Sequence, residues 1–412
     1  MNRAAARGGP FYGWIVVAAA FAVLFLAYGL QFSYGVFVTG MSAELGWSRA
    51  ATALPYSLYV FAYSALSAAT GRATDRFGPR QVITLGAVLL GLGWGASALV
   101  ASPWQLAVSL GLVAALGMSV AWVPCNATVA RWFTRRRGAA VAIASSGASL
   151  GNFVVPPLAG MLMVAWGWRT ALGIVALASA LAMLVAARYM VRDPETLGLA
   201  PDGDPVPAAT AAAPTLEPAL AEVRRSARFA LVIATYFCSW LVVFMPFVHL
   251  PAHAADLGFG AASAASLISA IGLGGVAGRL STGVASDWLG RFPALVTVFV
   301  LQAAAFVGFA VVDTLPALAV AALVFGFSYG GGVTLLPPLC GDLFGRTHMA
   351  SIVGVIFAVA GAPAAFGPYA AGWLYDLDGS YQTAFVGAAA LNLTALLLTL
   401  VLAVNVRRVT RS

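Results

Sequence analysis

Long apolar runs separated by short polar turns constrain the fold of this chain more than any other feature. A helix needs about 20 mostly apolar residues to cross a hydrocarbon core of roughly 30 Å, because its backbone N–H and C=O groups must all be bonded internally there. Twelve such runs are marked off by charges, prolines and polar clusters: residues 13–38, 50–70, 81–100, 104–128, 138–163, 169–190, 229–250, 262–286, 294–312, 317–341, 350–373 and 382–405. The sequence therefore predicts an all-α membrane protein with twelve transmembrane helices.

Two other fold classes are excluded by the same residues. A soluble multi-domain chain does not carry 61% hydrophobic and only 9% charged residues. A membrane β-barrel needs segments of about ten residues that alternate polar and apolar positions, and no such alternation continues for long in this sequence.

The arginines set the expected orientation of the helices. All 22 basic residues are arginine, and only Arg49 and Arg169 fall between predicted spans on the side away from the termini. Arg279 lies within a span, and the others lie on the termini side. Basic residues are in excess in short cytoplasmic loops, so both termini are expected in the cytoplasm. The net charge of +8 therefore reflects membrane topology and not a nucleic-acid-binding surface.

An internal repeat divides the chain into two halves. A polar segment rich in proline and alanine follows the sixth span, and we interpret it as a cytoplasmic linker, residues 192–226, between six-helix bundles at 1–191 and 227–412. Gly71, Asp75 and Gly78, after the second span, return as Gly283, Asp287 and Gly290 after the eighth, each displaced by 212 residues. One duplicated bundle is the simplest account, so two pseudo-symmetric bundles are predicted.

The loop pattern G-x-x-x-D-R-x-G-x-R after the second span resembles the signature of the major facilitator superfamily. The resemblance covers nearly the whole chain and implies that these loops latch the two bundles together at the cytoplasmic side. The latch residues expected from it are Gly71, Asp75, Arg76, Gly78, Arg80, Gly283, Asp287, Gly290 and Arg291. Loop charges that only set topology would account for the arginines, but not for glycines and aspartates that recur at fixed spacing.

A closer resemblance is to the monocarboxylate transporters and the bacterial oxalate/formate antiporter branch. It rests on four stretches: YGWIVVAAAF, ARWFTRRRGAAVAIASSGASLG, DPETLGLAPDG, and an arginine eight residues before the second loop aspartate. The family's substrate-binding arginine occupies the place of Arg279. The second cation of the oxalate/formate antiporter falls at about Ala360, so the resemblance implies a substrate with one carboxylate. The lysine and aspartate of the mammalian transporters fall at Phe32 and Gly275, so their proton coupling does not transfer.

Arg279 itself points to an anion-binding site. It lies eight residues before Asp287, or about 12 Å along a helix, which places it near the membrane midplane. A charge there costs about 2.5 to 3.5 kcal/mol on insertion scales, so it must face a cavity or a partner. The 14 acidic residues all fall in loops or at expected helix ends. A guanidinium without a resident carboxylate fits the carboxylate of a substrate; the alternative is that Arg279 extends toward the cytoplasm or supports the Asp287 loop.

Other candidate side chains are expected to line the same centre. The expected substrate contacts besides Arg279 are Tyr28, Met118, Trp122, Asn126, Ser145, Tyr329, Cys340 and Phe357. Tyr28 and Tyr329 rank first, because their family counterparts line the pathway and a phenol can bond to a carboxylate; packing is the alternative for all of them. His249 is the candidate for proton coupling, and the alternative is a helix-end histidine bonded to a carbonyl group. The cysteines and histidines show no metal-ligand spacing.

We therefore expect a secondary transporter of small monocarboxylates, lactate- or pyruvate-like, that works by alternating access with proton symport. The rivals are a carboxylate anion exchanger and an exporter of larger amphipathic or aromatic acids. No enzyme activity, catalytic residue, cofactor or metal is expected. The predicted partners are the organic anion, H⁺ and the lipid bilayer, with a monomer as the functional unit. The alanine-, glycine- and arginine-rich, lysine-free composition suggests a bacterial inner membrane.

Overall fold

A computed structural model describes residues 11–47, 49–204, 219–259 and 261–409, and these ranges contain helices and loops but no strand. The first half comprises α1 (Tyr12–Phe32), α2 (Tyr34–Leu45), α3 (Arg49–Phe77), α4 (Pro79–Ser97), α5 (Pro103–Val108), η2 (Ser109–Ala114), α6 (Ala115–Met118), α7 (Trp122–Trp132) and α8 (Arg137–Ala187). Short turns η3 (Pro194–Leu197) and η4 (Pro201–Gly203) and helix α9 (Leu220–Arg225) lie between the halves.

The second half repeats this order of long helices. It comprises α10 (Ala227–Trp240), α11 (Met245–Asp256), α12 (Ala261–Leu289), α13 (Arg291–Val311), α14 (Leu315–Phe344), α15 (Met349–Ile356), η5 (Phe357–Gly361), η6 (Pro363–Phe366), α16 (Gly367–Asp378) and α17 (Gln382–Val409). The bundle boundaries predicted at residues 191 and 227 remain a prediction, because residues 205–218 lie outside the described ranges.

The prediction of twelve spans is confirmed. Each predicted run coincides with helix in the described residues, and nine segments there are long and apolar enough to cross a membrane. One of the nine, α8, contains two crossings, because the chain turns at Gly167 with a φ of 74°. The remaining crossings are α3 and α4. Serine, threonine, tyrosine and arginine lower the hydropathy of α3, which packs against the opposite bundle rather than only against lipid.

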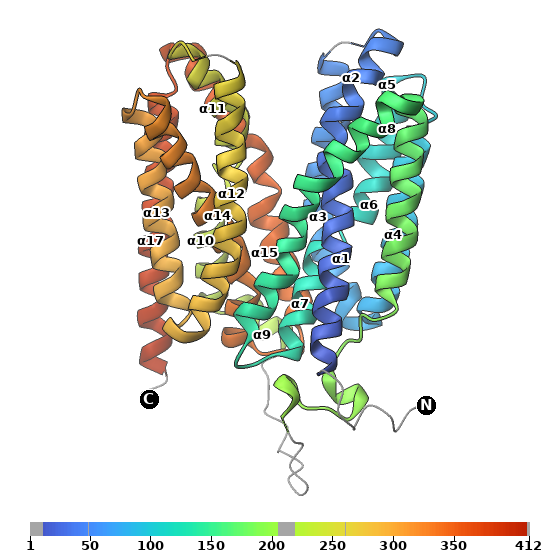
Figure 1. Cartoon of the computed structure of the whole chain (residues 1–412). Coiled ribbons are helices and arrows are strands. Elements are labelled where there is room, and N and C mark those ends of the chain that lie inside the picture. Colours follow the sequence, from blue (N-terminus) through green and yellow to red (C-terminus); the bar gives the residue numbers. More distant parts are fainter. Residues whose placement is uncertain (1–10, 48, 205–218, 260, 410–412) are drawn as a thin grey trace, which may run out of the picture.

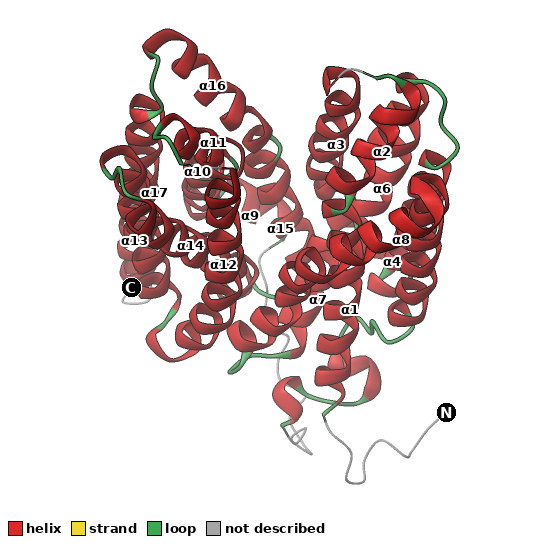
Figure 2. Ribbon diagram, turned by 45° about the horizontal axis from the view of Figure 1, so that its top comes forward, coloured by secondary structure: helices red, strands yellow, loops and turns green. Residues whose placement is uncertain are grey.

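The two bundles meet at one end. Figures 1 and 2 show them converging at the end where α1 begins and α17 finishes, and diverging toward the opposite end. Within the bundles, α1 and α4 pack on α8, and α12 packs on α14. Across the interface, α8 contacts α12 and α3 contacts α15, which are equivalent pairs in the repeat. The described structure therefore has a closed, termini-bearing end.

Irregular helix segments occur beside the bundle interface. The fourth crossing has π-helical geometry at Ser109–Ala114 and breaks before α7 begins at Trp122. The eleventh has π-helical geometry at Phe357–Gly361, before Pro363. π-Turns inside α-helices frequently mark functional positions, because they re-aim side chains that a regular helix would point elsewhere. Both breaks place an aromatic residue, Trp122 or Phe357, at the junction.

Hydrogen bonds also join the loops of the first bundle at the end opposite the termini. Glu44, near the end of α2, accepts hydrogen bonds from the Trp168 indole at 2.7 Å and the Arg169 guanidinium at 3.0 Å. These two donors lower the pKa of the Glu44 carboxyl below its ordinary value of 4.5. Arg169 also donates to the carbonyls of Ala98 and Val100. One predicted outer-loop arginine therefore joins three loops of the same bundle.

Candidate functional site

Arg279 lies at the interface between the bundles. Its side chain, on α12, is buried, with 5% of the residue exposed. The guanidinium carbon lies 5.4 Å from the ring centre of Trp122, which belongs to α7 of the opposite bundle, and 5.7 Å from that of Tyr329 on α14. Cation–π contacts of this kind stabilise a buried arginine but leave its N–H donors unused.

Two of the three guanidinium nitrogens of Arg279 lack acceptors among the described residues. Its Nε and Nη1 are buried with no hydrogen-bond partner, and no carboxylate lies within 4 Å of it in the described part of the chain. The indole Nε1 of Trp122 is also a buried donor without a described partner. Leaving a charged donor buried and unpaired costs several kcal/mol, about 3 to 5 for a broken buried pair. Because this site has more hydrogen-bond donors than acceptors, it fits an anionic ligand.

The predicted alternatives for Arg279 receive no support from contacts. Asp287 bonds to Arg291 and to backbone N–H groups of α8, and no contact joins Asp287 to Arg279 in the described residues. Arg279 is buried. An arginine whose side chain extends to the membrane surface would instead keep its charged end in water.

Aromatic rings surround the Arg279 position. The ring centres of Tyr28 and Trp122 lie 5.9 Å apart, and those of Trp122 and Phe357 lie 6.5 Å apart. Phe357 in turn packs edge-on against Trp240, at 5.3 Å. These four side chains and Tyr329 come from five separate crossings and form what we call the aromatic wall. Such a surface can pack against the apolar part of a ligand while Arg279 binds its charge.

The other predicted contacts lie in the same interface region or in the packing around it. Ser145 is fully buried on α8, and its hydroxyl lies 3.3 Å from that of Thr334, so it joins the bundles. Asn126 is fully buried and donates to the Trp122 carbonyl, while its Oδ1 has no described partner. Met118 and Cys340 are buried, and no described contact joins either to Arg279. Their substrate contacts remain predictions.

At the termini-bearing end, Asp287 connects the two bundles. Its carboxylate accepts the backbone N–H groups of Gly138 at 2.8 Å and Ala139 at 2.9 Å, in the first turn of α8. It also pairs with Arg291 at 2.6 Å. A carboxylate at a helix N-terminus satisfies donors that have no partner within the helix and interacts favourably with the helix dipole. The second loop therefore caps a helix of the first bundle.

The first loop makes the equivalent contact. Asp75 accepts the backbone N–H of Ser351, in the first turn of α15, at 2.7 Å. Ser351 follows Ala139 by 212 residues, as Asp287 follows Asp75, so the two contacts are related by the internal repeat. Arg131 lies 3.6 Å from the other Asp75 oxygen. We call these two aspartates and the helix ends that they cap the paired caps.

Glycine is needed at the predicted latch positions for two different structural reasons. A Cβ on Gly71 would overlap the carbonyl oxygen of Ala350, and one on Gly283 would overlap the side chain of Ala142, so both permit close approach between bundles. Gly78 and Gly290 have φ values of 88° and 90°, which only glycine adopts readily, and they precede α4 and α13.

The Gly71 contact gives a direct prediction. Gly71→Ala should weaken the closed end by roughly 1 to 3 kcal/mol, because the added methyl group must push apart two backbones. Transport should slow several-fold while the protein stays folded. The matched control is Gly95→Ala on α4, where a Cβ would meet nothing within 4 Å. Equal transport rates for the two variants would contradict the close-approach role.

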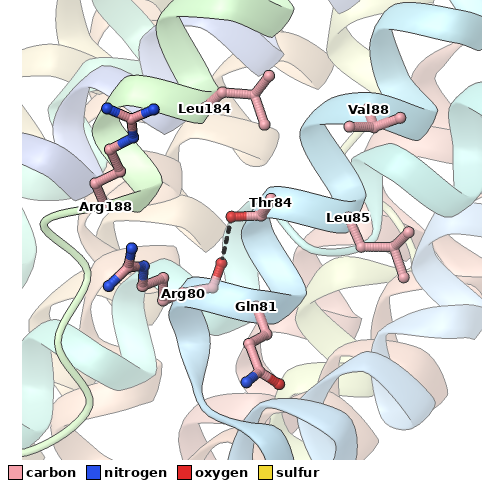
Figure 3. Close-up of a pocket in the computed structure, with 7 residues that line it drawn as sticks. All are labelled: Arg80, Gln81, Thr84, Leu85, Val88, Leu184 and Arg188. Atoms are coloured by element: carbon pink, nitrogen blue, oxygen red, sulfur yellow. Dashed lines mark hydrogen bonds between the residues drawn. The ribbon is translucent and has the colours of Figure 1, made fainter.

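Two predicted latch arginines form no ion pair or side-chain hydrogen bond with the facing bundle in the described residues. Arg76 is exposed, and its guanidinium lies 5.1 Å from the ring centre of its neighbour Phe77. Arg80 is exposed and lines a groove within the first bundle (Figure 3). Their place in the latch remains a prediction without a described contact to support it.

Several charged residues at the closed end were not predicted from the sequence. Arg137 bonds to Asp342, which also accepts from Arg291 at 2.8 Å. Arg131 bonds to the Thr347 carbonyl and pairs with Asp193 at 3.1 Å. The arginine cluster in ARWFTRRRG was a signal of this network, but its partners lie more than 50 residues away in the sequence and could not be assigned by spacing.

The segment after the sixth crossing joins this network. Asp193 contacts Arg131 of the first bundle, while Glu195 pairs with Arg346 of the second at 3.3 Å. Asp202 accepts the backbone N–H groups of Thr134 and Arg135. The stretch DPETLGLAPDG is therefore packed against the closed end, so this part of the predicted linker is held by contacts with both bundles.

His249 lies within the second bundle. Its Nε2 is 2.7 Å from the Pro368 carbonyl oxygen on α16, and its Nδ1 is 3.1 Å from the Tyr381 hydroxyl. Because a carbonyl only accepts, Nε2 carries a proton and donates to it. Both ring nitrogens therefore have partners, and neither partner belongs to the Arg279 site.

Comparisons with known proteins agree with this architecture. A family model described as the Major Facilitator Superfamily matches residues 20–368. Monocarboxylate transporter 11 of Mus musculus is 30% identical over 386 residues, which cover 91% of this chain and 84% of that protein. Monocarboxylate transporter 13 of Bos taurus is 29% identical over 386 residues, which cover 92% and 86%. These relatives are transporters and not enzymes.

Solved structures show the same fold. The transporter FucP in the outward conformation superposes with a TM-score of 0.73 at 15% identity, covering 95% of this chain and 99% of that one. The human organic anion transporter MFSD10 superposes with a TM-score of 0.71 at 18% identity, covering 95% and 100%. At these identities the likeness supports the two-bundle architecture and no finer conclusion.

Proposed function

Because the chain belongs to the Major Facilitator Superfamily, we propose that this multi-pass membrane transporter carries small monocarboxylates such as lactate or pyruvate by alternating access. The observation that supports this most is the buried Arg279 guanidinium, whose Nε and Nη1 lack partners. A carboxylate can accept from two neighbouring N–H groups of a guanidinium in a forked geometry and balances its charge, whereas a cation cannot accept and a neutral sugar leaves the charge unbalanced. The names of the relatives, monocarboxylate transporters 11 and 13, favour the same substrate class.

The contacts between the bundles support a transport cycle of alternating access. The described state is closed at the termini-bearing end, which we propose to be cytoplasmic in a bacterial inner membrane, so the substrate enters from outside. Release to the cytoplasm requires the paired caps at Asp75 and Asp287 to separate and the far ends to close. Each bundle contributes one half of the site, Trp122 from one and Arg279 from the other, so the proposed functional unit is a monomer.

Proton symport is the proposed coupling, with His249 as the group that exchanges the proton. The imidazolium form can keep both present contacts, because the Pro368 carbonyl accepts from Nε2 and the Tyr381 hydroxyl can turn to accept from Nδ1. Protonation therefore need not leave a buried donor unpaired.

His249→Gln should abolish stimulation of uptake by a proton gradient while substrate exchange continues, because glutamine keeps polar contacts but does not titrate. The measurement compares gradient-driven uptake with counterflow in proteoliposomes. Tyr381→Phe is the matched control: it keeps the imidazole of His249 and should retain part of the stimulation. Full gradient stimulation in His249→Gln would show that the proton travels with the substrate anion and not through this residue.

Uptake of labelled L-lactate into proteoliposomes, with and without an inward proton gradient, tests the proposed function. The expected result is uptake that rises with the gradient. Trans-acceleration by internal lactate without any response to the gradient would indicate an anion exchanger instead. The aromatic wall favours a second candidate, larger amphipathic or aromatic acids; exclusion of lactate together with entry of such an acid would replace the small-monocarboxylate proposal.

A further inference from the structure

A basic groove lies on the outer side of the first bundle, away from the Arg279 site. It has a volume of about 610 Å³ and runs between α4 and the end of α8 (Figure 3). Its lining residues are Arg80, Gln81, Thr84, Leu85, Val88, Leu184 and Arg188. Arg80 and Arg188 extend from the two different helices on the same side of the groove. The contacts that close the termini-bearing end do not include this groove.

The two arginines are not neutralised by the protein. Neither guanidinium forms an ion pair or a side-chain hydrogen bond in the described part of the chain, whereas Arg131, Arg137 and Arg291 all pair with aspartates. Two like charges that face one groove repel each other unless an anion lies between them. The first turn of α4, which begins at Pro79, lacks a side-chain cap and adds unsatisfied N–H groups at the same end. The charged end of the groove therefore favours an anion.

Apart from Gln81 and Thr84, the rest of the groove is lined by leucine and valine side chains. Leu85 and Val88 are exposed, at 61% and 40%, and Leu184 lies opposite on α8. The exposed apolar surface continues along both helices through Leu92 and Leu181. In a membrane-spanning bundle this surface faces acyl chains, and the arginines mark the level of the headgroups.

We propose that this groove binds an anionic phospholipid, with its phosphate between Arg80 and Arg188 and an acyl chain along Leu85, Val88 and Leu184. Basic pockets between transmembrane helices are suited to acidic lipid headgroups, and the adjoining apolar surface distinguishes a lipid from a soluble phosphate. The bound lipid would join α4 to α8 within the first bundle.

Titration of the purified full-length protein in detergent with phosphatidylglycerol tests this, with binding followed by native mass spectrometry and by the melting temperature. Each basic residue near a lipid surface contributes about 1 kcal/mol, so Arg80→Gln and Arg188→Gln should each weaken binding about fivefold, and the double variant about thirtyfold. Phosphatidylcholine should bind weakly to all of them. Both side chains are exposed, so the variants should melt like the wild type without lipid.

The matched control is Arg224→Gln with Arg225→Gln. These arginines are also exposed and lie on α9, and neither lines the groove of Arg80 and Arg188, so the control removes the same charge. The proposal requires the control to retain wild-type affinity. An equal loss in both double variants would mean unspecific attraction by net charge and would overturn the site. Displacement of the lipid by millimolar inorganic phosphate alone would assign the groove to a soluble anion and would overturn it too.

Discussion

Arg279→Gln is expected to reduce carboxylate uptake strongly without unfolding the protein. Glutamine keeps hydrogen-bonding atoms but removes the charge and the forked donors, and loss of one partner of a buried ion pair costs about 2 to 5 kcal/mol. Uptake at low substrate concentration should therefore fall by roughly thirtyfold to several thousandfold. Arg279→Lys should retain a small part of the activity, because an ammonium supplies a point charge without the fork.

The melting temperature distinguishes a role of Arg279 in substrate binding from a role in packing. A buried charge without a partner carries a desolvation cost, so its removal should leave the melting temperature in the absence of substrate unchanged or raise it. Substrate should raise the melting temperature of the wild type but not of Arg279→Gln. The control is Arg76→Gln, an exposed arginine beside Phe77. A large fall in melting temperature combined with retained uptake would mean that Arg279 supports packing and not substrate binding.

Asp287→Asn is expected to open the closed end of the molecule. Asparagine lowers the strength of three contacts at once, to the N–H groups of Gly138 and Ala139 and to Arg291. Charge-assisted bonds of this kind contribute about 1.5 to 3 kcal/mol each, so the population closed at this end should fall by at least about tenfold. Asp75→Asn should have a smaller effect, because Asp75 accepts one N–H group and lies 3.6 Å from Arg131.

Spin labels at Phe77 and Trp288 report this opening, since both positions are exposed at the closed end and belong to different bundles. The distance distribution should shift to longer values in Asp287→Asn, and the rate of transport should fall. Asp313→Asn, at an exposed aspartate without a described ion pair, should leave both unchanged. An unaltered distance distribution in Asp287→Asn would show that the paired caps do not hold this end closed.

The fold was predictable because its main determinant is local. Runs of about 20 apolar residues between charged turns specify membrane crossings without knowledge of tertiary contacts, and the repeat of Asp75 as Asp287 revealed the duplication. Arg279 was predictable for a related reason: a charge within an apolar run has a cost that a function must offset. Trp122 and Tyr329 were among the candidates, and both contact it.

The contacts between loops could not be predicted, because they depend on which helix ends meet when the bundles pack. No sequence pattern pairs Arg137 with Asp342, or Asp287 with the backbone of Gly138. Trp240 was missed because an aromatic residue in an apolar helix has no feature that separates packing from ligand contact. The place of Arg80 in the latch stays a prediction, and the described structure adds only that Arg80 lines a groove together with Arg188.

Equilibrium binding of a labelled monocarboxylate to the purified protein tests the role of Arg279 without a gradient or a transport cycle. The expected result is saturable binding to the wild type and to Arg76→Gln, and no detectable binding to Arg279→Gln. Binding of equal affinity to Arg279→Gln would contradict it, since the carboxylate would then be held without the one buried guanidinium that the described structure leaves unpaired between the bundles.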